Sequence, residues 1–115
     1  LIERIARNTR HGGVWCGTST FHHKLNDDVR VMGTLPSAPE LQKNPWGHKY
    51  EYKYGELVDA IEYVVNFDKV VKLAYECGFY LVLKRSFVSY AVSKCHADAH
   101  ANDAIHFVFI FRRAC

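Results

Sequence analysis

The sequence predicts an α/β fold: half of a doubly wound sheet, with a small antiparallel sheet inserted into it. An apolar helical pattern followed by a short apolar strand occurs twice, within residues 1–19 and again within 66–83. Between these units, His48 to Tyr54 alternates aromatic and charged residues with a period of two. A helix followed by a buried strand is half of a βαβ unit, so two such units predict a layered sheet. The alternating stretch predicts a second, smaller sheet.

The first unit begins with the last turns of a helix. Apolar residues fall on one helical face and arginines on the other, and Gly12-Gly13 ends the pattern. The stretch Val14–Ser19 follows these glycines and is short, apolar and rich in β-forming residues. We therefore expect a buried strand in parallel pairing there.

The pattern weakens between residues 20 and 44. A short strand is indicated around Val29–Met32, and the prolines Pro36, Pro39 and Pro45 predict a loop. His48 to Tyr54 is predicted as a strand whose exposed face carries the charged residues, or whose inner face carries the tyrosines. Residues 57–65 continue the same small sheet.

The second unit holds the clearest helix. Asn66 is a favourable N-cap and Gly78 a favourable C-terminal stop for the apolar helical pattern between them. Phe79–Leu83 is predicted as a second buried strand. A final apolar strand is predicted over Ile105–Phe111, and the small polar residues 93–103 before it predict a loop.

Composition limits the classes of function. A length of 115 residues fits one domain or part of one, and a net charge of +3 is too small to predict duplex binding by charge alone. The four cysteines form no CxxC pair, so we expect neither a disulfide framework nor a zinc knuckle. This use of cysteine indicates a reducing compartment, nuclear or cytoplasmic. No apolar run approaches the ~20 residues of a membrane span, so no membrane contact is expected. The opening at Leu1, already inside an amphipathic pattern, suggests a fragment.

The stretch PWGHKYEYKYGELVDAIEY carries the clearest chemical signal. Glu62 lies at the edge of an apolar run among several aromatic residues. A carboxylate can accept the N1–H and N2–H of guanine while flat rings stack on the base. The alternatives are an ordinary half-buried strand, which would also place Tyr50, Tyr52 and Tyr54 on one face, and a solvated acid at Glu62.

These residues resemble the C-terminal half of the messenger-RNA cap guanine-N7 methyltransferases, which use S-adenosylmethionine. The resemblance is densest from Trp46 to Tyr90, in WGHKYEYKYGELVDAIEYVV, LAYECGF and YLVLKRSF. Weaker similarity flanks it in HGGVWCGTST and IHFVFIF. The resemblance implies a Rossmann-like sheet whose residues 20–65 form an inserted cap-binding lobe, between the helix and strand of 1–19 and the helix and strands of 66–115.

The resemblance also implies a set of substrate-binding residues. Glu62 matches the guanine-binding glutamate of the family, and Tyr50 matches an aromatic residue of its cap pocket. Tyr63 is the neighbour on the Glu62 segment. His106 stands where the family usually has a tyrosine. Thr20 lies in a segment whose sequence in the family is usually Thr-Thr-Pro-Asn. The proline of that segment is absent from this chain.

The cofactor half of such an enzyme is not evident. A nucleotide-like cofactor needs a glycine-rich turn that opens a helix after the first strand, whereas Gly12-Gly13 precedes a strand. We expect the S-adenosylmethionine site upstream of Leu1. The implied function is methyl transfer to guanine N7 of the RNA cap, with capped RNA and the upstream half or other capping-enzyme components as partners. The alternative is a non-catalytic, degenerate subunit that binds or stimulates a capping enzyme.

Three further groups of residues carry weaker signals. The run Cys95, His96, Asp98 and His100 has metal-ligand residue types, but its tight spacing fits no standard zinc pattern, so no metal is expected. His22-His23 is interpreted as solvent-facing. Basic residues that end strands are either solvated caps or contacts for a triphosphate: Lys84, Arg85, Arg112 and Arg113.

Overall fold

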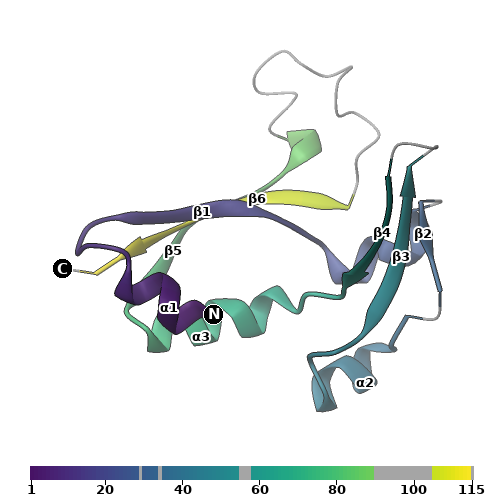
Figure 1. Cartoon of the computed structure of the whole chain (residues 1–115), viewed down its shortest axis with the longest axis horizontal. Helices are drawn as coiled ribbons and strands as arrows, with labels where there is room; N and C mark the ends of the chain where they lie inside the picture. The colour runs from purple at the N-terminus through teal and green to yellow at the C-terminus, as the bar shows by residue number, and fades with distance from the viewer. Residues whose placement is uncertain (29, 34, 55–57, 90–104, 115) are drawn as a thin grey trace.

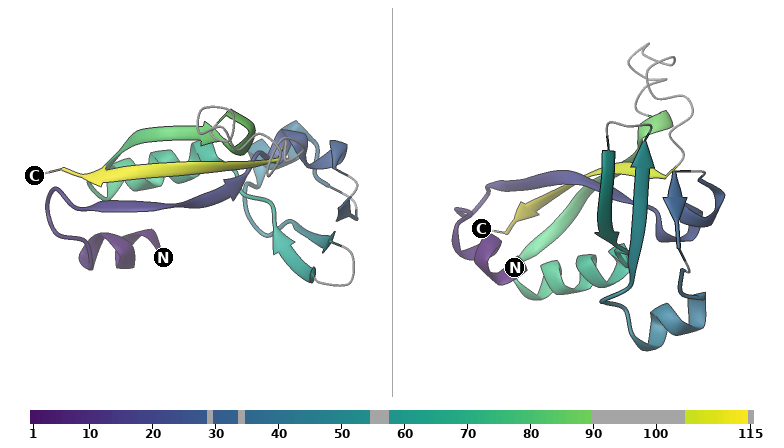
Figure 2. Two further views of the ribbon diagram at one scale, coloured as in Figure 1. Left: turned by 90° about the horizontal axis from the view of Figure 1, so that it is seen from above. Right: turned by 45° about the vertical axis from the view of Figure 1, so that its right-hand side comes forward.

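The computed structural model describes residues 1–28, 30–33, 35–54, 58–89 and 105–114, which form two three-stranded antiparallel sheets (Figure 1). The main sheet has the strand order β1 (Val14–Thr20), β6 (His106–Arg113) and β5 (Phe79–Ser86). The lobe sheet has the order β2 (Val31–Met32), β3 (Lys49–Tyr54) and β4 (Val58–Tyr63). The strands of the lobe sheet run crosswise to those of the main sheet (Figures 1 and 2).

The main sheet is packed on one side by two helices, α1 (Ile2–Arg7) and α3 (Phe67–Glu76) (Figure 1). Alternate side chains of the central strand β6 point to these helices, and Phe107, Phe109 and Phe111 are all buried. Phe67, Phe79, Ala6 and Ala74 complete this cluster. The period of two in IHFVFIF therefore fills one face of the sheet, as expected for a sheet covered by helices.

The strand β1 differs from the expectation of a buried strand in parallel pairing. It pairs antiparallel with β6, and Val14 is 52% exposed while Thr20 is buried. The described helices cover one face of the sheet, so every second side chain of β1 points away from them. The same alternation corrects the prediction for β5, in which Phe79 is buried and Val82 is 51% exposed.

The mixed α/β class is confirmed, and the order of strands adds one feature to it. Both β1 and β5 pair antiparallel with β6, so these two strands run in the same direction with the last strand between them. Parallel strands separated by a helical connection are a property of doubly wound sheets. The doubly wound arrangement itself stays a prediction, because the pairings seen in the described residues are all antiparallel.

The helix α3 begins and ends where the sequence predicts. The Asn66 side chain accepts a hydrogen bond from the Lys69 backbone N–H at 3.4 Å, and Gly78 adopts a φ of +88° just after the helix. A side-chain oxygen at the N-cap satisfies a free N–H, and glycine takes the left-handed conformation without steric cost. The strands β3 and β4 confirm the prediction of a small sheet over residues 48–65.

The segment from residue 20 to 44 contains two short helices, η1 (His22–Asp27) and α2 (Ala38–Lys43), and the strand β2, which confirms the short strand indicated around Val29–Met32. At the start of α2, the Ser37 hydroxyl accepts a hydrogen bond from the Glu40 backbone N–H, and Pro39 lies in the first turn. Proline is tolerated there because its missing N–H would have no helical partner. The loop expectation is therefore wrong for Ala38–Lys43 and correct only for the residues around it.

The lobe has its own apolar cluster, composed of Leu25, Leu41, Tyr50, Val64 and Ile105. Ile105 directly precedes β6, and the Phe21 N–H donates to its carbonyl at 2.6 Å. The lobe is thus attached to the main sheet where β1 ends and β6 begins. The predicted loop at residues 93–103 lies outside the described residues, and no helix within the described ranges is long and apolar enough to cross a membrane.

Candidate functional site

Four of the five predicted binding residues meet where the lobe sheet joins the main sheet. Tyr50 on β3 is the pairing partner of Glu62 on β4, and Thr20 on β1 is the pairing partner of His106 on β6. Residues that are paired across antiparallel strands project to the same face. The two pairs meet at Tyr50, because the Thr20 side chain lies near the Tyr50 phenol and lowers its pKa.

The Tyr50 phenol is the centre of this group. Its O–H donates to Glu62 Oε2 at 2.8 Å, and the residue is only 3% exposed. Burial raises the pKa of Tyr50 well above its usual value, and the hydrogen bond to Glu62 raises it further. The phenol therefore stays protonated near neutral pH and holds Glu62 in one orientation.

The Glu62 carboxylate keeps capacity for a further partner. Tyr50 occupies Oε2, whereas no hydrogen bond from another described residue reaches Oε1. Glu62 is half-buried, and no buried side-chain polar atom among the described residues lacks a partner. A carboxylate can accept about four hydrogen bonds, so Glu62 can receive two N–H donors from a ligand.

Aromatic rings border the same junction. The ring of His106 lies 6.2 Å from that of Tyr52, edge to face, and stacks on Phe87 with centroids 5.4 Å apart and planes 26° apart. Tyr52 follows Tyr50 at a spacing of two on β3, so both point to the inner face of the lobe sheet. The site thus combines one carboxylate with flat rings from β3 and β6.

An arginine that the sequence did not single out also belongs to this junction. Arg30 binds Asp28 through two contacts, Nε to Oδ1 at 2.9 Å and Nη2 to Oδ2 at 2.5 Å, and its guanidinium lies 5.4 Å from the centre of the Tyr52 ring. The hydrogen bond from Arg30 holds the pKa of Asp28 below its usual value. The only signal in the sequence is an Asp-x-Arg spacing in a segment without a clear pattern.

Tyr63 does not join the group. It follows Glu62 directly on β4, so it points to the outer face of the lobe sheet, where it is 53% exposed. The ammonium of Lys49 lies 5.7 Å from the centre of its ring. The structure therefore places Tyr63 and Glu62 on opposite faces.

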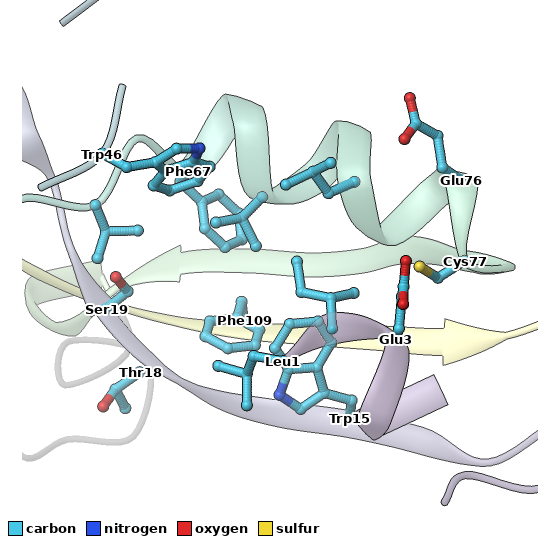
Figure 3. A pocket seen from close by; sticks show the side chains of 14 residues that line it. Leu1, Glu3, Trp15, Thr18, Ser19, Trp46, Phe67, Glu76, Cys77 and Phe109 are labelled. Atoms are coloured by element: carbon cyan, nitrogen blue, oxygen red, sulfur yellow. The ribbon is translucent and has the colours of Figure 1, made fainter. Parts of the chain in front are cut away.

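A larger hollow of about 710 Å³ lies elsewhere, between α1, α3 and β1 (Figure 3). Its walls are mainly apolar and include Trp15, Phe67 and Phe109; Glu3 and Glu76 lie toward one end. Its size is typical of small-molecule sites, but such sites also need a few convergent polar groups. Those groups converge at Tyr50 and Glu62 instead, so we take the junction as the candidate site.

Metal binding finds no support in the part of the chain that the structure describes. No group of three His, Cys, Asp or Glu side chains there is placed to hold a metal ion. The run from Cys95 to His100 lies outside the described residues. Cys16 and Cys77 are both free thiols.

Comparison with known proteins gives a consistent result. Residues 19–105 match the family model described as the mRNA (guanine-N(7))-methyltransferase domain. Two curated relatives are mRNA cap guanine-N(7) methyltransferases of Cryptococcus neoformans var. neoformans serotype D, from strains B-3501A and JEC21. They are each 29% identical to this chain, over 97 and 101 residues that cover 76% of it. These matches span only 14% and 16% of the relatives' own lengths.

Proposed function

This chain belongs to the family of mRNA (guanine-N(7))-methyltransferase domains, and from that premise we propose that it supplies the guanine-binding side of a cap methyltransferase. The substrate in this proposal is the 5′ cap of messenger RNA, and the product is the cap methylated at guanine N7. The proposed cap-binding lobe comprises residues 20–65, and His106 contributes from β6.

The observation that carries the proposal is the orientation of Glu62. Its carboxylate is fixed by Tyr50 at 2.8 Å and retains an oxygen that no described residue binds. Guanine presents two adjacent donors, N1–H and N2–H, and a carboxylate is the natural acceptor for such a pair. Adenine lacks this pair of donors, so the arrangement favours guanine.

The chemistry asks for position more than for proton transfer. Guanine N7 already carries the lone pair that attacks the methyl group, so no general base is required. What the chain's residues must do is hold the base rigidly, and a hydrogen-bonded carboxylate among packed rings serves that purpose. The negative charge of Glu62 also favours the positively charged N7-methylguanine over the neutral base.

S-adenosylmethionine would supply the methyl group, but the described residues do not fit it. Such cofactors lie on a glycine-rich turn between a strand and a helix. Among the described strands, β1 leads from Thr20 into η1 without a glycine, and Gly12-Gly13 precedes the strand instead of following it. We therefore assign binding of the methyl donor to other residues of the protein and derive no step through it.

The test is the affinity of the full-length protein for a cap dinucleotide, guanosine linked through a triphosphate to adenosine (GpppA), measured by isothermal titration. The substitution Glu62→Gln should weaken binding by about tenfold to a hundredfold, because it replaces a charged acceptor by an amide that also carries a donor. Glu51→Gln is the matched control: Glu51 is an exposed acid on the outer face of the same sheet. It should change the affinity less than twofold.

Equal affinities for wild type and Glu62→Gln would remove the assignment of Glu62. Binding that depends on Glu62 without methyl transfer by the full-length protein would instead favour a non-catalytic subunit that binds the cap. The binding result can be read whether or not the protein is active.

A further inference from the structure

A cluster of basic side chains surrounds Phe21, the residue that follows β1. The ammonium of Lys24 lies 4.7 Å from the centre of the Phe21 ring, and that of Lys84 lies 5.1 Å from it. The ring of His23 lies 5.6 Å from Phe21, and that of His22 lies 5.5 Å from His23. These four side chains come from η1 and β5, and we call them the basic cluster.

Lys84 is positioned by aromatic rings and not by an acid. Its ammonium lies 5.1 Å, 5.1 Å and 4.8 Å from the ring centres of Phe21, Phe67 and Phe107, which belong to three different segments. In the described part of the chain the only ion pair joins Arg30 and Asp28, so no described carboxylate forms one with Lys84 or Lys24. Cation–π contacts stabilise an ammonium without neutralising its charge. Both lysines therefore keep N–H donors for an anion.

A small hollow of about 70 Å³ opens beside this cluster. Its lining includes Lys84, His22, His23 and Thr20, and also the acidic residue Asp68. It is large enough for a few waters or one compact tetrahedral anion. The expectation that His22-His23 faces solvent is therefore wrong for His22, which is half-buried, and holds for His23, which is exposed.

The hollow adjoins the candidate guanine site through one residue. Thr20 lines the hollow and also lies near the phenol of Tyr50, which holds Glu62. An RNA chain that leads away from a cap held at Glu62 can therefore pass the end of β1, where the hollow opens. Lysine and protonated histidine are common partners of phosphate in proteins.

We propose that Lys84, Lys24, His22 and His23 form an oxyanion site that binds a phosphate of the RNA chain attached to the cap. This inference rests on the proposed guanine site and adds a contact for the RNA beyond the cap. The phosphate occupies the hollow, receives an N–H donor from Lys84, and favours the protonated form of His22. Lys24 lies beside the hollow, against the Phe21 ring.

The site should respond to pH through His22. Burial and the neighbouring His23 hold the pKa of His22 below its usual value; Asp68 on α3 raises it and Lys84 on β5 lowers it, and the net shift is downward. His22 is therefore mainly neutral at pH 7 in the free protein. A bound phosphate stabilises its charged form, so the affinity for RNA should rise as the pH falls from 8 to 5.5.

The test compares two ligands, a capped decanucleotide RNA and the cap dinucleotide GpppA, on the full-length protein. Lys84→Met keeps the apolar stem against the three rings and removes the charge. It should weaken binding of the capped RNA about tenfold at 0.1 M salt and lower the slope of log affinity against log salt by about 0.7. Its affinity for GpppA should stay within twofold of wild type.

Lys72→Met is the matched control, because Lys72 is exposed on α3 and has no place in the cluster. It should leave both affinities unchanged. His22→Gln should reduce the pH dependence of RNA binding and leave that of GpppA binding as it was.

Equal effects of Lys84→Met and Lys72→Met on capped RNA would overturn the proposal. So would an equal loss for RNA and for GpppA, since the cluster would then act on the cap or on the fold. An uncapped decanucleotide separates this site from the guanine site. If its binding depends on Lys84 while GpppA does not bind, the phosphate site stands and the guanine proposal fails.

Discussion

The main sheet and the lobe sheet each have three described strands but bury different kinds of side chain. The main sheet packs phenylalanines from β5, β6 and α3 against one another, with ring centres 4.8 to 6.3 Å apart. The core of the lobe includes Tyr50, whose phenol reaches Glu62. Buried aromatic carbon mainly stabilises a fold, whereas a buried phenol that holds a carboxylate prepares a binding group. We therefore propose that the main sheet mainly stabilises the fold and that the lobe sheet serves recognition.

The largest expected effect is on the main sheet. Phe111→Ala removes a fully buried ring from the middle of the aromatic cluster and should lower the free energy of unfolding by about 3 to 5 kcal/mol. Denaturant unfolding of the full-length protein measures it. Tyr75→Ala is the control, since Tyr75 is 75% exposed on α3 and its loss should cost less than about 0.5 kcal/mol. A cost below about 1 kcal/mol for Phe111→Ala would contradict the division between the two regions.

A smaller effect on stability is expected in the lobe. Tyr50→Phe removes the hydroxyl that holds Glu62 and should cost about 1 kcal/mol in the free energy of unfolding, together with a loss of affinity for GpppA. Tyr63→Phe makes the same chemical change on the outer face of the lobe and should alter neither quantity. If the two substitutions behave alike, the inner face of the lobe has no special role.

The elements with local signals could be predicted from the sequence. The helix α3 has its cap and its stop in the printed residues, Asn66 and Gly78, and the alternation at Lys49–Tyr54 identifies β3. The helix α2 also had a local signal, Ser37 three residues before Glu40, but the prolines suggested a loop. A proline in the first turn of a helix is compatible with the helix, and this distinction was missed.

The features that depend on distant parts of the chain could not be predicted. The exposure of Val14 depends on which face of the sheet the helices cover, and no local pattern contains that information. The contact of Thr20 with Tyr50 and the position of Arg30 over Tyr52 require the two sheets to be joined first. The placement of Tyr63 is different. Consecutive residues of a strand point to opposite faces, so the sequence alone could have separated it from Glu62.

The most direct measurement asks whether Glu62 reads the edge of guanine. Inosine lacks the N2 amino group of guanine, so the affinities for GpppA and its inosine counterpart IpppA isolate one hydrogen bond. The wild-type protein should prefer GpppA about tenfold, and Glu62→Gln should reduce this preference to less than about threefold, because the two changes remove the same contact. The same preference in wild type and Glu62→Gln would contradict the account, since the carboxylate held by Tyr50 would then not contact the base.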